Sequence, residues 1–255
     1  MDTQPVAQAL LDEAVALARE AGQLTLEWFR SADLVVDEKG DGSPVTAADR
    51  AAERLIRERL AATHPGDAIV GEEEADVEGT TGRRWIIDPI DGTKPFTHGV
   101  PLYCTLLAFE DEHGPAIGVI DLPALGETVY AGRGLGCFCN GVRAHVSTRE
   151  HLWGSYLTTS GFDYWDERAL SATRESGMYM RTWGDGYGYA MVATGRAEAM
   201  VDPAAAPWDV APMPVIIGEA GGRFTDFTNT VTIDGGNGLA TNGILHAEVL
   251  GIVSR

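Results

Sequence analysis

The sequence is poor in cysteine and has no long hydrophobic run. Its three cysteines, Cys104, Cys137 and Cys139, include no C-x-x-C pair, so we expect buried thiols in a reducing compartment. The first thirty residues lack a basic start and a continuous apolar run, which argues against a signal peptide. No segment approaches the roughly 20 apolar residues that a transmembrane helix needs. We therefore expect a cytoplasmic protein with no membrane partner.

Basic residues are also scarce. The 255 residues include 19 Lys and Arg against 38 Asp and Glu, and the formal net charge of -19 is spread along the whole chain. Proteins hold nucleic acids largely through Lys and Arg contacts to phosphates, so we expect no nucleic-acid partner. Divalent cations or cationic ligands fit this charge better.

The pattern of apolar residues predicts a mixed α/β fold. Helical spacing between Val6 and Ala21 predicts a long first helix that ends near Phe29, and a second helix follows Thr46. From Trp85 onward, short runs rich in β-branched residues predict a mostly antiparallel sheet. Further on, we expect strands near 155–159 and 199–202 and helices near 166–177, 186–196 and 209–220.

The chain is long enough for two lobes. A new series of predicted strands and helices begins after "GCFCNG". This places the boundary between the lobes near residue 145 and divides the chain into lobes 1–145 and 146–255. Residues 35–45, "VVDEKGDGSPV", are rich in glycine and charge and predict a mobile loop or hairpin beside a site.

Acidic residues stand at the ends of several predicted elements. Each has an ordinary structural explanation: Thr46 and Asp49 match a helix capping box, Asp209 can cap a helix, and Glu72 begins a run of three glutamates. The pair in "IIDPIDGT", Asp88 and Asp91, is harder to explain in this way. Unpaired anions at a buried strand end cost several kcal/mol unless cations compensate them.

A metal ion is the natural compensation for these acids. Carboxylates without nearby Cys or His ligands favour Mg²⁺ or Mn²⁺ over Zn²⁺. Pro89 stiffens the bend between Asp88 and Asp91 and can aim the Ile90 carbonyl inward. Gly92 and Thr93 then begin a predicted helix, whose free N–H groups can hold a phosphate.

Five stretches resemble a known family when taken in order. They are "SPVTAAD", "IVGEE", "WIIDPIDGTKPFTHGVP", "GCFCNG" and "PWDVAPMPVIIGEAGG", and they resemble the Mg²⁺-dependent, lithium-sensitive phosphatases of the inositol monophosphatase superfamily. The resemblance implies an α/β (α+β) fold, a layered α-β-α-β-α sandwich, and a homodimer. It also implies hydrolysis of a small phosphate ester by a water molecule activated by two or three Mg²⁺ ions, with Mn²⁺ as a substitute.

The resemblance assigns the metal ligands residue by residue. Glu72, Asp88 and the Ile90 carbonyl match the ligands of the first metal. Asp88, Asp91 and Asp209 match those of the second, and Glu72 also lies near a third, loosely held ion.

It assigns the other site residues in the same way. Asp49 and Thr93, with Glu72, match the catalytic group that orients and activates the attacking water. The N–H groups of Gly92 and Thr93 match the phosphate-binding pair. Lys39 matches a lysine that the family keeps close to the active site, and we include it among the substrate-binding residues.

The segment "RTWGDGYGYAMVATGRAEAMVDP" bears on the substrate. Members that hydrolyse histidinol phosphate carry W-G-D-x-Y-G-Y followed by D-P, and residues 183–189, Asp202 and Pro203 match that pattern. Histidinol phosphate carries an ammonium and an imidazole, with which Asp185 and Asp202 could pair. Inositol-specific members usually have Glu at the position of Asp202. Pro214, soon after Asp209, should distort the start of the helix there.

Three hypotheses follow for the function. The first is a histidinol-phosphate phosphatase of histidine biosynthesis. The second is an inositol monophosphatase or a broader sugar-phosphate phosphatase. The third, from another class, is a catalytically silent metal-binding regulatory protein, which a lost ligand would indicate; every ligand position is kept.

Overall fold

The computed structural model describes residues 4–40 and 42–254. The first helix, α1 (Gln8–Thr25), is followed by the antiparallel hairpin of β1 (Val36–Glu38) and β2 (Pro44–Thr46) and by α2 (Ala47–Thr63). The hairpin confirms the hairpin predicted for residues 35–45, of which Asp41 lies outside the described residues. Helix α2 starts at the predicted capping box, in which the Thr46 N–H donates to Asp49 Oδ2 at 2.8 Å.

A seven-stranded sheet follows in the order β3-β4-β5-β6-β7-β8-β9. Strand β3 is parallel to β4, and every other neighbouring pair is antiparallel, as predicted for this region. The short helix α3 and a 3-10 turn, Pro123–Leu125, lie between strands. The bounds are β3 Ala68–Gly71, β4 Arg84–Asp91, α3 Thr93–Thr97, β5 Cys104–Asp111, β6 Gly114–Leu122, β7 Glu127–Gly132, β8 Gly136–Cys139 and β9 Val142–Arg143.

A five-stranded sheet in the order β11-β10-β12-β14-β13 forms most of the remainder. Strand β10 is parallel to β11 and β12, whereas β14 is antiparallel to β12 and β13. The bounds are β10 Tyr156–Thr158, α4 Glu167–Glu175, β11 Tyr179–Arg181, α5 Asp185–Ala193, β12 Ala199–Asp202, α6 Pro207–Val210, α7 Met213–Glu219, β13 Arg223–Thr225, β14 Gly238–Thr241 and α8 His246–Val253.

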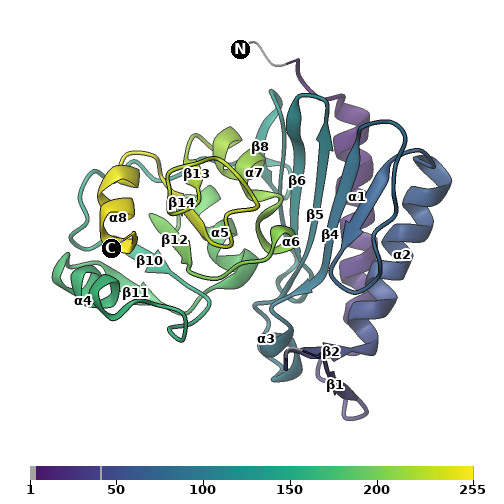
Figure 1. Cartoon of the computed structure of the whole chain (residues 1–255), viewed down its shortest axis with the longest axis horizontal. Coiled ribbons are helices and arrows are strands. Elements are labelled where there is room, and N and C mark those ends of the chain that lie inside the picture. Colours follow the sequence, from purple (N-terminus) through teal and green to yellow (C-terminus); the bar gives the residue numbers. More distant parts are fainter. Residues whose placement is uncertain (1–3, 41, 255) are drawn as a thin grey trace.

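The elements stack in five layers, which Figure 1 shows nearly edge-on. Helices α1 and α2 cover one face of the larger sheet, and α5 and α7 pack between its other face and the smaller sheet. Helices α4 and α8 cover the outer face of the smaller sheet. Alternate residues of β12 serve the two faces, since Met200 belongs to the central core and Ala199 and Val201 to the outer one. The predicted α-β-α-β-α sandwich is confirmed.

Two helix boundaries differ from the prediction. Helix α1 ends at Thr25, and the chain continues in turns to Arg30, whose φ of 61° is left-handed and incompatible with a helix. The helix expected over 209–220 is two helices, α6 and α7, with Pro212 just before α7 and Pro214 in its first turn. Proline cannot donate the helical hydrogen bond, so the distortion predicted from Pro214 occurs as a break.

The predicted lobe boundary falls in the segment between β9 and β10. The division into two lobes stays a prediction. Over residues 4–40 and 42–254, none of the helices is both long and apolar enough to cross a membrane.

Candidate active site

Strand β4 delivers two acids to one place because its end is irregular. The pairing of β4 with β5 shifts register between Asp88 and Asp91, so the two side chains no longer follow the strict alternation of a regular strand. The Thr105 hydroxyl donates to the Pro89 carbonyl at 2.9 Å and fixes this bend. The predicted stiff bend at Pro89 therefore lies at the end of a buried strand.

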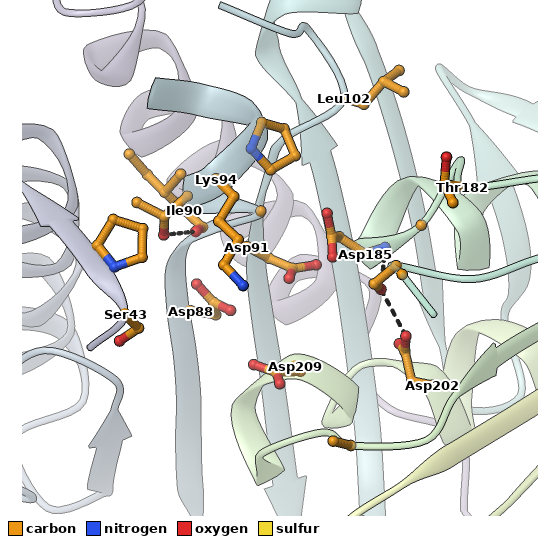
Figure 2. A pocket seen from close by; sticks show the side chains of 18 of the residues that line it. Ser43, Asp88, Ile90, Asp91, Lys94, Leu102, Thr182, Asp185, Asp202 and Asp209 are labelled. Carbon is orange, nitrogen blue, oxygen red and sulfur yellow. Dashed lines mark hydrogen bonds between the residues drawn. The ribbon is translucent and has the colours of Figure 1, made fainter. Parts of the chain in front are cut away.

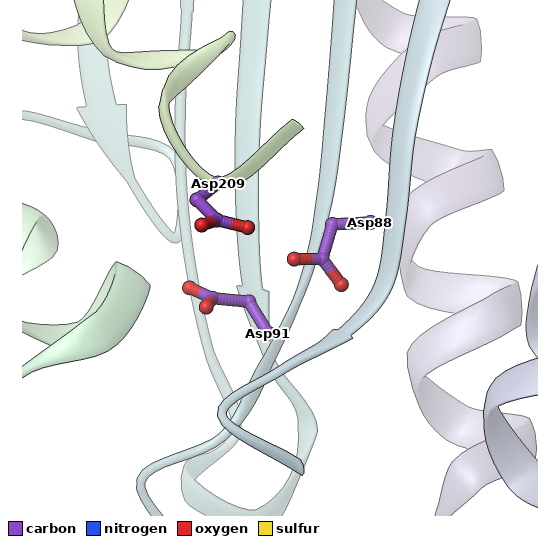
Figure 3. Close-up of side chains that lie close together, drawn as sticks. All are labelled: Asp88, Asp91 and Asp209. Carbon is purple, nitrogen blue, oxygen red and sulfur yellow. The ribbon is translucent and has the colours of Figure 1, made fainter. Parts of the chain in front are cut away.

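A third acid arrives from the middle layer. Asp209 is the third residue of α6, and its Oδ2 accepts from the N–H of Ala206, the residue before the helix, at 2.8 Å, as the acid of a capping box does. One carboxylate oxygen each of Asp88, Asp91 and Asp209 lies within 4.8 Å of the others. Figure 3 shows the three side chains pointing toward one another. Asp209 was predicted to cap the helix that follows it, but it lies inside α6, where it bonds back to Ala206 and also belongs to the acidic cluster.

The three acids repel one another in a buried place. Burial raises the pKa of Asp88 well above its usual range, and the charges of Glu72, Asp91 and Asp209 raise it further. Burial likewise raises the pKa of Asp209 to about 7. Among the described residues, Asp88 Oδ1 is a buried oxygen that has no hydrogen-bond partner. An oxygen of this kind, aimed at two other carboxylates, fits a bound cation.

Asp91 is held from two sides. The Gly186 N–H, at the start of α5, and the Cys104 thiol, on β5, both donate to Asp91 Oδ2. Gly186 leaves no room for a side chain, because a Cβ there would lie 2.4 Å from Cys104 Sγ. Sequence reasoning missed these two supports, because the Gly186 contact spans 95 residues and the Cys104 contact depends on how β5 pairs with β4.

Glu72 lies just after β3 and lines the same cavity as the three acids. Its Oε1 accepts from Lys39 Nζ at 2.7 Å, and Lys39 also donates to Glu73 Oε1 at 2.7 Å. Burial lowers the pKa of Lys39, but these two glutamates outweigh that effect and raise it above the ordinary value. The predicted proximity of Lys39 to the site is therefore a direct pairing with Glu72.

Asp49 and Thr93, predicted as a pair, are in contact. The Thr93 hydroxyl lies 3.3 Å from Asp49 Oδ1 and 3.1 Å from the Ile90 carbonyl oxygen. Asp49 Oδ2 is taken by the N–H and hydroxyl of Thr46, and burial raises the pKa of the Asp49 carboxyl. The capping explanation and the pairing with Thr93 therefore both hold for Asp49, one for each oxygen.

Gly92 makes the turn between β4 and α3. Its φ of 85° is left-handed, which glycine adopts without strain. Gly92 and Thr93 both line the cavity. Their N–H groups begin α3, so the predicted anion-binding position lies beside the acids.

The cavity has a volume of about 430 Å³. Figure 2 shows Asp185 beside Asp91, with Asp88 to one side of them and Asp202 to the other. In the part of the chain that the structure describes, the lining includes neither Lys39 nor Asp49, which stand behind Glu72 and Thr93 respectively. The lining does include the other predicted site residues, which are Glu72, Asp88, Ile90, Asp91, Gly92, Thr93, Asp185, Asp202 and Asp209.

Ser160 connects Asp185 and Asp202, the other two predicted acids that line the cavity. Its hydroxyl donates to Asp202 Oδ1 at 2.7 Å and accepts from the Asp185 N–H at 2.9 Å. Asp185 has a φ of 53°, and a Cβ on the preceding Gly184 would lie 2.2 Å from the Ser160 Cα. The W-G-D stretch is thus locked onto the loop after β10. Sequence analysis missed Ser160 because nothing in "TTSG" distinguishes it.

Burial also dominates the electrostatics of these two acids. It raises the pKa of Asp202 to about 7, with the charge of Asp185 adding to the effect and the Ser160 hydroxyl opposing it. The pKa of Asp185 is raised by burial too, although the charge of Lys94 opposes the shift. A cation placed between these acids would favour their ionised forms.

Comparisons with known proteins agree with this geometry. The model of the inositol monophosphatase family matches residues 7–255. A histidinol-phosphatase of Chlorobaculum parvum is 43% identical over 91% of each chain, and one of Mycobacterium tuberculosis is 40% identical over 93% of this chain and 95% of its own. The crystal structure of the extragenic suppressor protein suhB of Bartonella henselae has a TM-score of 0.89 at 28% identity, covering 97% of this chain and 99% of that one. The chain therefore belongs to the inositol monophosphatase family.

Proposed function

We propose that this protein is a Mg²⁺-dependent phosphomonoesterase that hydrolyses L-histidinol phosphate to L-histidinol and phosphate. One observation carries the proposal: a single cavity holds a cluster of three acids and, next to it, a second pair of acids, Asp185 and Asp202. The first arrangement suits a metal-assisted phosphate site, and the second suits a substrate with cationic groups. The histidinol-phosphatases of C. parvum and M. tuberculosis support the same substrate.

The acids would hold the metal ions. Asp88 lies close to Asp91 and Asp209, and its carboxyl also feels the charge of Glu72. It is the residue that can serve two ions, and oxygen donors without sulfur favour Mg²⁺, with Mn²⁺ as a substitute. When bound, the ions polarise the phosphate ester, lower the pKa of water and stabilise the leaving oxygen.

Other residues of the chain place the reactants. Asp49 and Thr93 form a hydrogen-bonded pair next to the Ile90 carbonyl, where the Thr93 hydroxyl can orient a water molecule. The N–H groups of Gly92 and Thr93 would hold a phosphate oxygen. Glu72 would complete the catalytic group and accept a proton from the water, once Lys39 releases its carboxylate.

Recognition of the organic part would fall to the second pair of acids. A protonated amine or an imidazolium can pair with Asp185 and Asp202, which Ser160 holds in fixed relation to each other. A neutral polyol has no group that compensates these buried carboxylates. This difference favours histidinol phosphate over inositol phosphate, which remains the alternative substrate. A catalytically silent metal-binding regulatory protein would be indicated by a lost ligand, and every ligand position is kept.

We also propose a cytoplasmic homodimer that binds no nucleic acid and no membrane. The three free cysteines fit a reducing compartment, and the net charge of -19 disfavours phosphate-backbone contacts. Size-exclusion chromatography with light scattering would test the dimer.

The substrate assignment is tested with Asp185→Asn. Asparagine tolerates the left-handed backbone at this position, whereas alanine does not. If Asp185 pairs with a cation, the loss of a charge-assisted hydrogen bond lowers kcat/KM for histidinol phosphate by roughly ten- to a hundredfold. Inositol 1-phosphate, assayed beside it with Mg²⁺, should change little. An equal loss on both substrates would contradict the role of Asp185, and a wild-type preference for inositol 1-phosphate would overturn the substrate.

A further inference from the structure

Helix α2 carries two rows of residues on its buried face. Apolar residues form one row and pack toward α1 and the large sheet; they include Ala52, Ile56 and Leu60. Asp49, Glu53 and Arg57, four residues apart from one another, form the second row, and all three are buried. Side chains at this spacing project from one side of a helix. The charged row therefore needs partners outside the helix.

Glu53 finds those partners in the turn after β3. Its Oε2 accepts from the Glu73 N–H at 2.8 Å, and its Oε1 accepts from the Glu74 N–H at 3.1 Å. Oε1 also accepts from Arg57 Nε at 2.7 Å. The side chain of Glu53 is fully buried, so these bonds replace all the water that the carboxylate would have.

Arg57 closes the same turn from the other end. Its Nη2 donates to the Glu74 carbonyl at 2.9 Å and its Nη1 to the Ala75 carbonyl at 3.1 Å. Gly71 leaves room for this contact, because a Cβ there would lie 2.2 Å from Glu53 Oε1. The glycine in "IVGEE" is thus required by the approach of Glu53, although its own φ is not left-handed.

The turn held in this way contains Glu72. The backbone on its C-terminal side is bonded to Glu53 and Arg57, and the strand on its N-terminal side pairs with β4. The Glu72 side chain is left to face the cavity and Lys39. Asp49 sits on α2 one turn before Glu53 and contacts Thr93. One helix therefore fixes both Asp49 and the turn of Glu72.

Stability alone does not account for the buried pair of Glu53 and Arg57. Replacing a buried ion pair with apolar residues of similar size is often neutral or stabilising, and the neighbouring row of α2 is already apolar. An apolar pair would not, however, accept the two N–H groups of the turn. The carboxylate of Glu53 therefore holds the backbone of the turn, which an apolar side chain cannot do.

We propose that Glu53 is a positioning residue that sets the place of Glu72 through the Glu73 and Glu74 N–H groups. The proposal rests on the proposed function, in which Glu72 is a metal ligand. Partners that orient a metal ligand from behind typically contribute ten- to a hundredfold to metal affinity. Loss of the Glu53 carboxylate should therefore weaken Mg²⁺ binding without any change in the groups that face the cavity.

The test compares Mg²⁺ dissociation constants by titration calorimetry in the wild type, Glu53→Gln and the double variant Glu53→Met/Arg57→Leu. The double variant removes both charges together, so that no unpaired charge remains buried. We expect it to unfold cooperatively near the wild-type temperature and to bind Mg²⁺ about tenfold more weakly or worse. Glu53→Gln retains one acceptor oxygen, so its Mg²⁺ dissociation constant should lie between those of the wild type and the double variant. A folded double variant that binds Mg²⁺ as the wild type does would overturn the proposal.

Asp111→Asn provides the matched control. Asp111 is the last residue of β5. Like Glu53, it accepts hydrogen bonds from an arginine side chain, Arg133, and from a backbone N–H, that of His113. Its replacement should cost stability and leave the Mg²⁺ dissociation constant within about twofold of the wild type. Equal weakening of Mg²⁺ binding by the control would mean that Glu53 acts through general stability, which contradicts the proposal.

The same substitutions made in a Glu72→Gln protein show whether Glu53 acts through Glu72. In a Glu72→Gln protein, Glu53→Met/Arg57→Leu should weaken Mg²⁺ binding little further, because the ligand it positions is gone. Fully additive effects would contradict the proposal. Failure of the proposed function is separately visible, since a wild type that binds Mg²⁺ but hydrolyses no phosphate ester still permits each of these binding comparisons.

Discussion

Glu53 and Asp88 are buried acids near the same cavity, and they are treated in opposite ways. Glu53 accepts three hydrogen bonds from Arg57 and from two backbone N–H groups. Asp88 faces other carboxylates, and within the described residues its Oδ1 has no hydrogen-bond partner. Both acids lose their water on folding. Groups of the protein replace the lost water of Glu53, whereas Asp88 needs a bound cation to do so.

This contrast separates residues that build the site from residues that bind at it. Glu53 and Arg57 have internal partners and fix the backbone around the cavity. The acids of β4 and α6 have their pKa values raised because burial and mutual repulsion disfavour their charged forms. A perturbed acid in a cleft is a candidate for function, whereas a buried acid with satisfied bonds indicates scaffolding.

Asp88→Asn should give the largest effect. The change removes the carboxylate best placed to serve two ions, whose stabilisation of the reaction is worth several kcal/mol, so kcat/KM should fall by a factor on the order of a thousand or more. Without metal, the melting temperature should stay equal or rise, because a repelled charge is lost. Phosphate release at saturating Mg²⁺ and thermal melts in EDTA measure the two effects. Substantial remaining activity would rule out the bridging role.

Asp226→Asn is the control for that experiment, because the Asp226 carboxylate has hydrogen-bond partners within the protein. Asp226 Oδ1 accepts from the N–H groups of Thr228 and Thr230, and none of these three residues lines the cavity. Its replacement should lower the melting temperature while kcat/KM stays within about twofold. The two variants should thus show opposite patterns of activity and stability.

Ser160→Ala should give an intermediate effect on one substrate. The change removes the hydroxyl that joins Asp202 to the Asp185 N–H, and a lost hydrogen bond of about 1.4 kcal/mol corresponds to a tenfold rise in KM for histidinol phosphate. Turnover at saturation should change little, because the Ser160 hydroxyl bonds to none of the three clustered acids. An equal fall in kcat for histidinol phosphate and inositol 1-phosphate would show that Ser160 supports the fold instead.

The sequence predicted what depends on local pattern. The capping box at Thr46, the antiparallel sheet after Trp85 and the acids at the end of β4 follow from spacing within a few residues. The family resemblance added the layered fold. The helix expected over 209–220 was broken because Pro212 and Pro214 both act there, and the prediction weighed only Pro214.

Contacts between distant segments lay beyond the sequence. Ser160 meets Asp185 and Asp202 only after β10, α5 and β12 have been brought together by the smaller sheet. Nothing in the local sequence distinguishes Glu53, and its burial depends on the path of the chain after β3. Periodicity identifies the face of a helix that is buried, but it does not identify what covers that face.

The smallest expected effect is on stability and concerns Asp121, a buried acid on β6. It has a hydrogen-bond partner, as Glu53 does, but its pKa is raised, as that of Asp88 is. Its Oδ1 accepts from the Thr128 hydroxyl at 2.8 Å, and burial raises its pKa to about 6 against that bond and the charge of Arg19. The folded protein therefore holds a proton between about pH 4 and 6 that the unfolded chain has lost, so this group's contribution to stability is greatest at low pH and is lost as the pH rises through 6. Asp121→Asn removes that dependence. Urea unfolding at pH 5.0 and 7.5 should show that the wild type loses roughly 1–2 kcal/mol more of its unfolding free energy than the variant does between these values. Identical losses would mean that Asp121 is compensated as fully as Glu53, and a fall in phosphatase activity would mean that it belongs with the acids of the cavity.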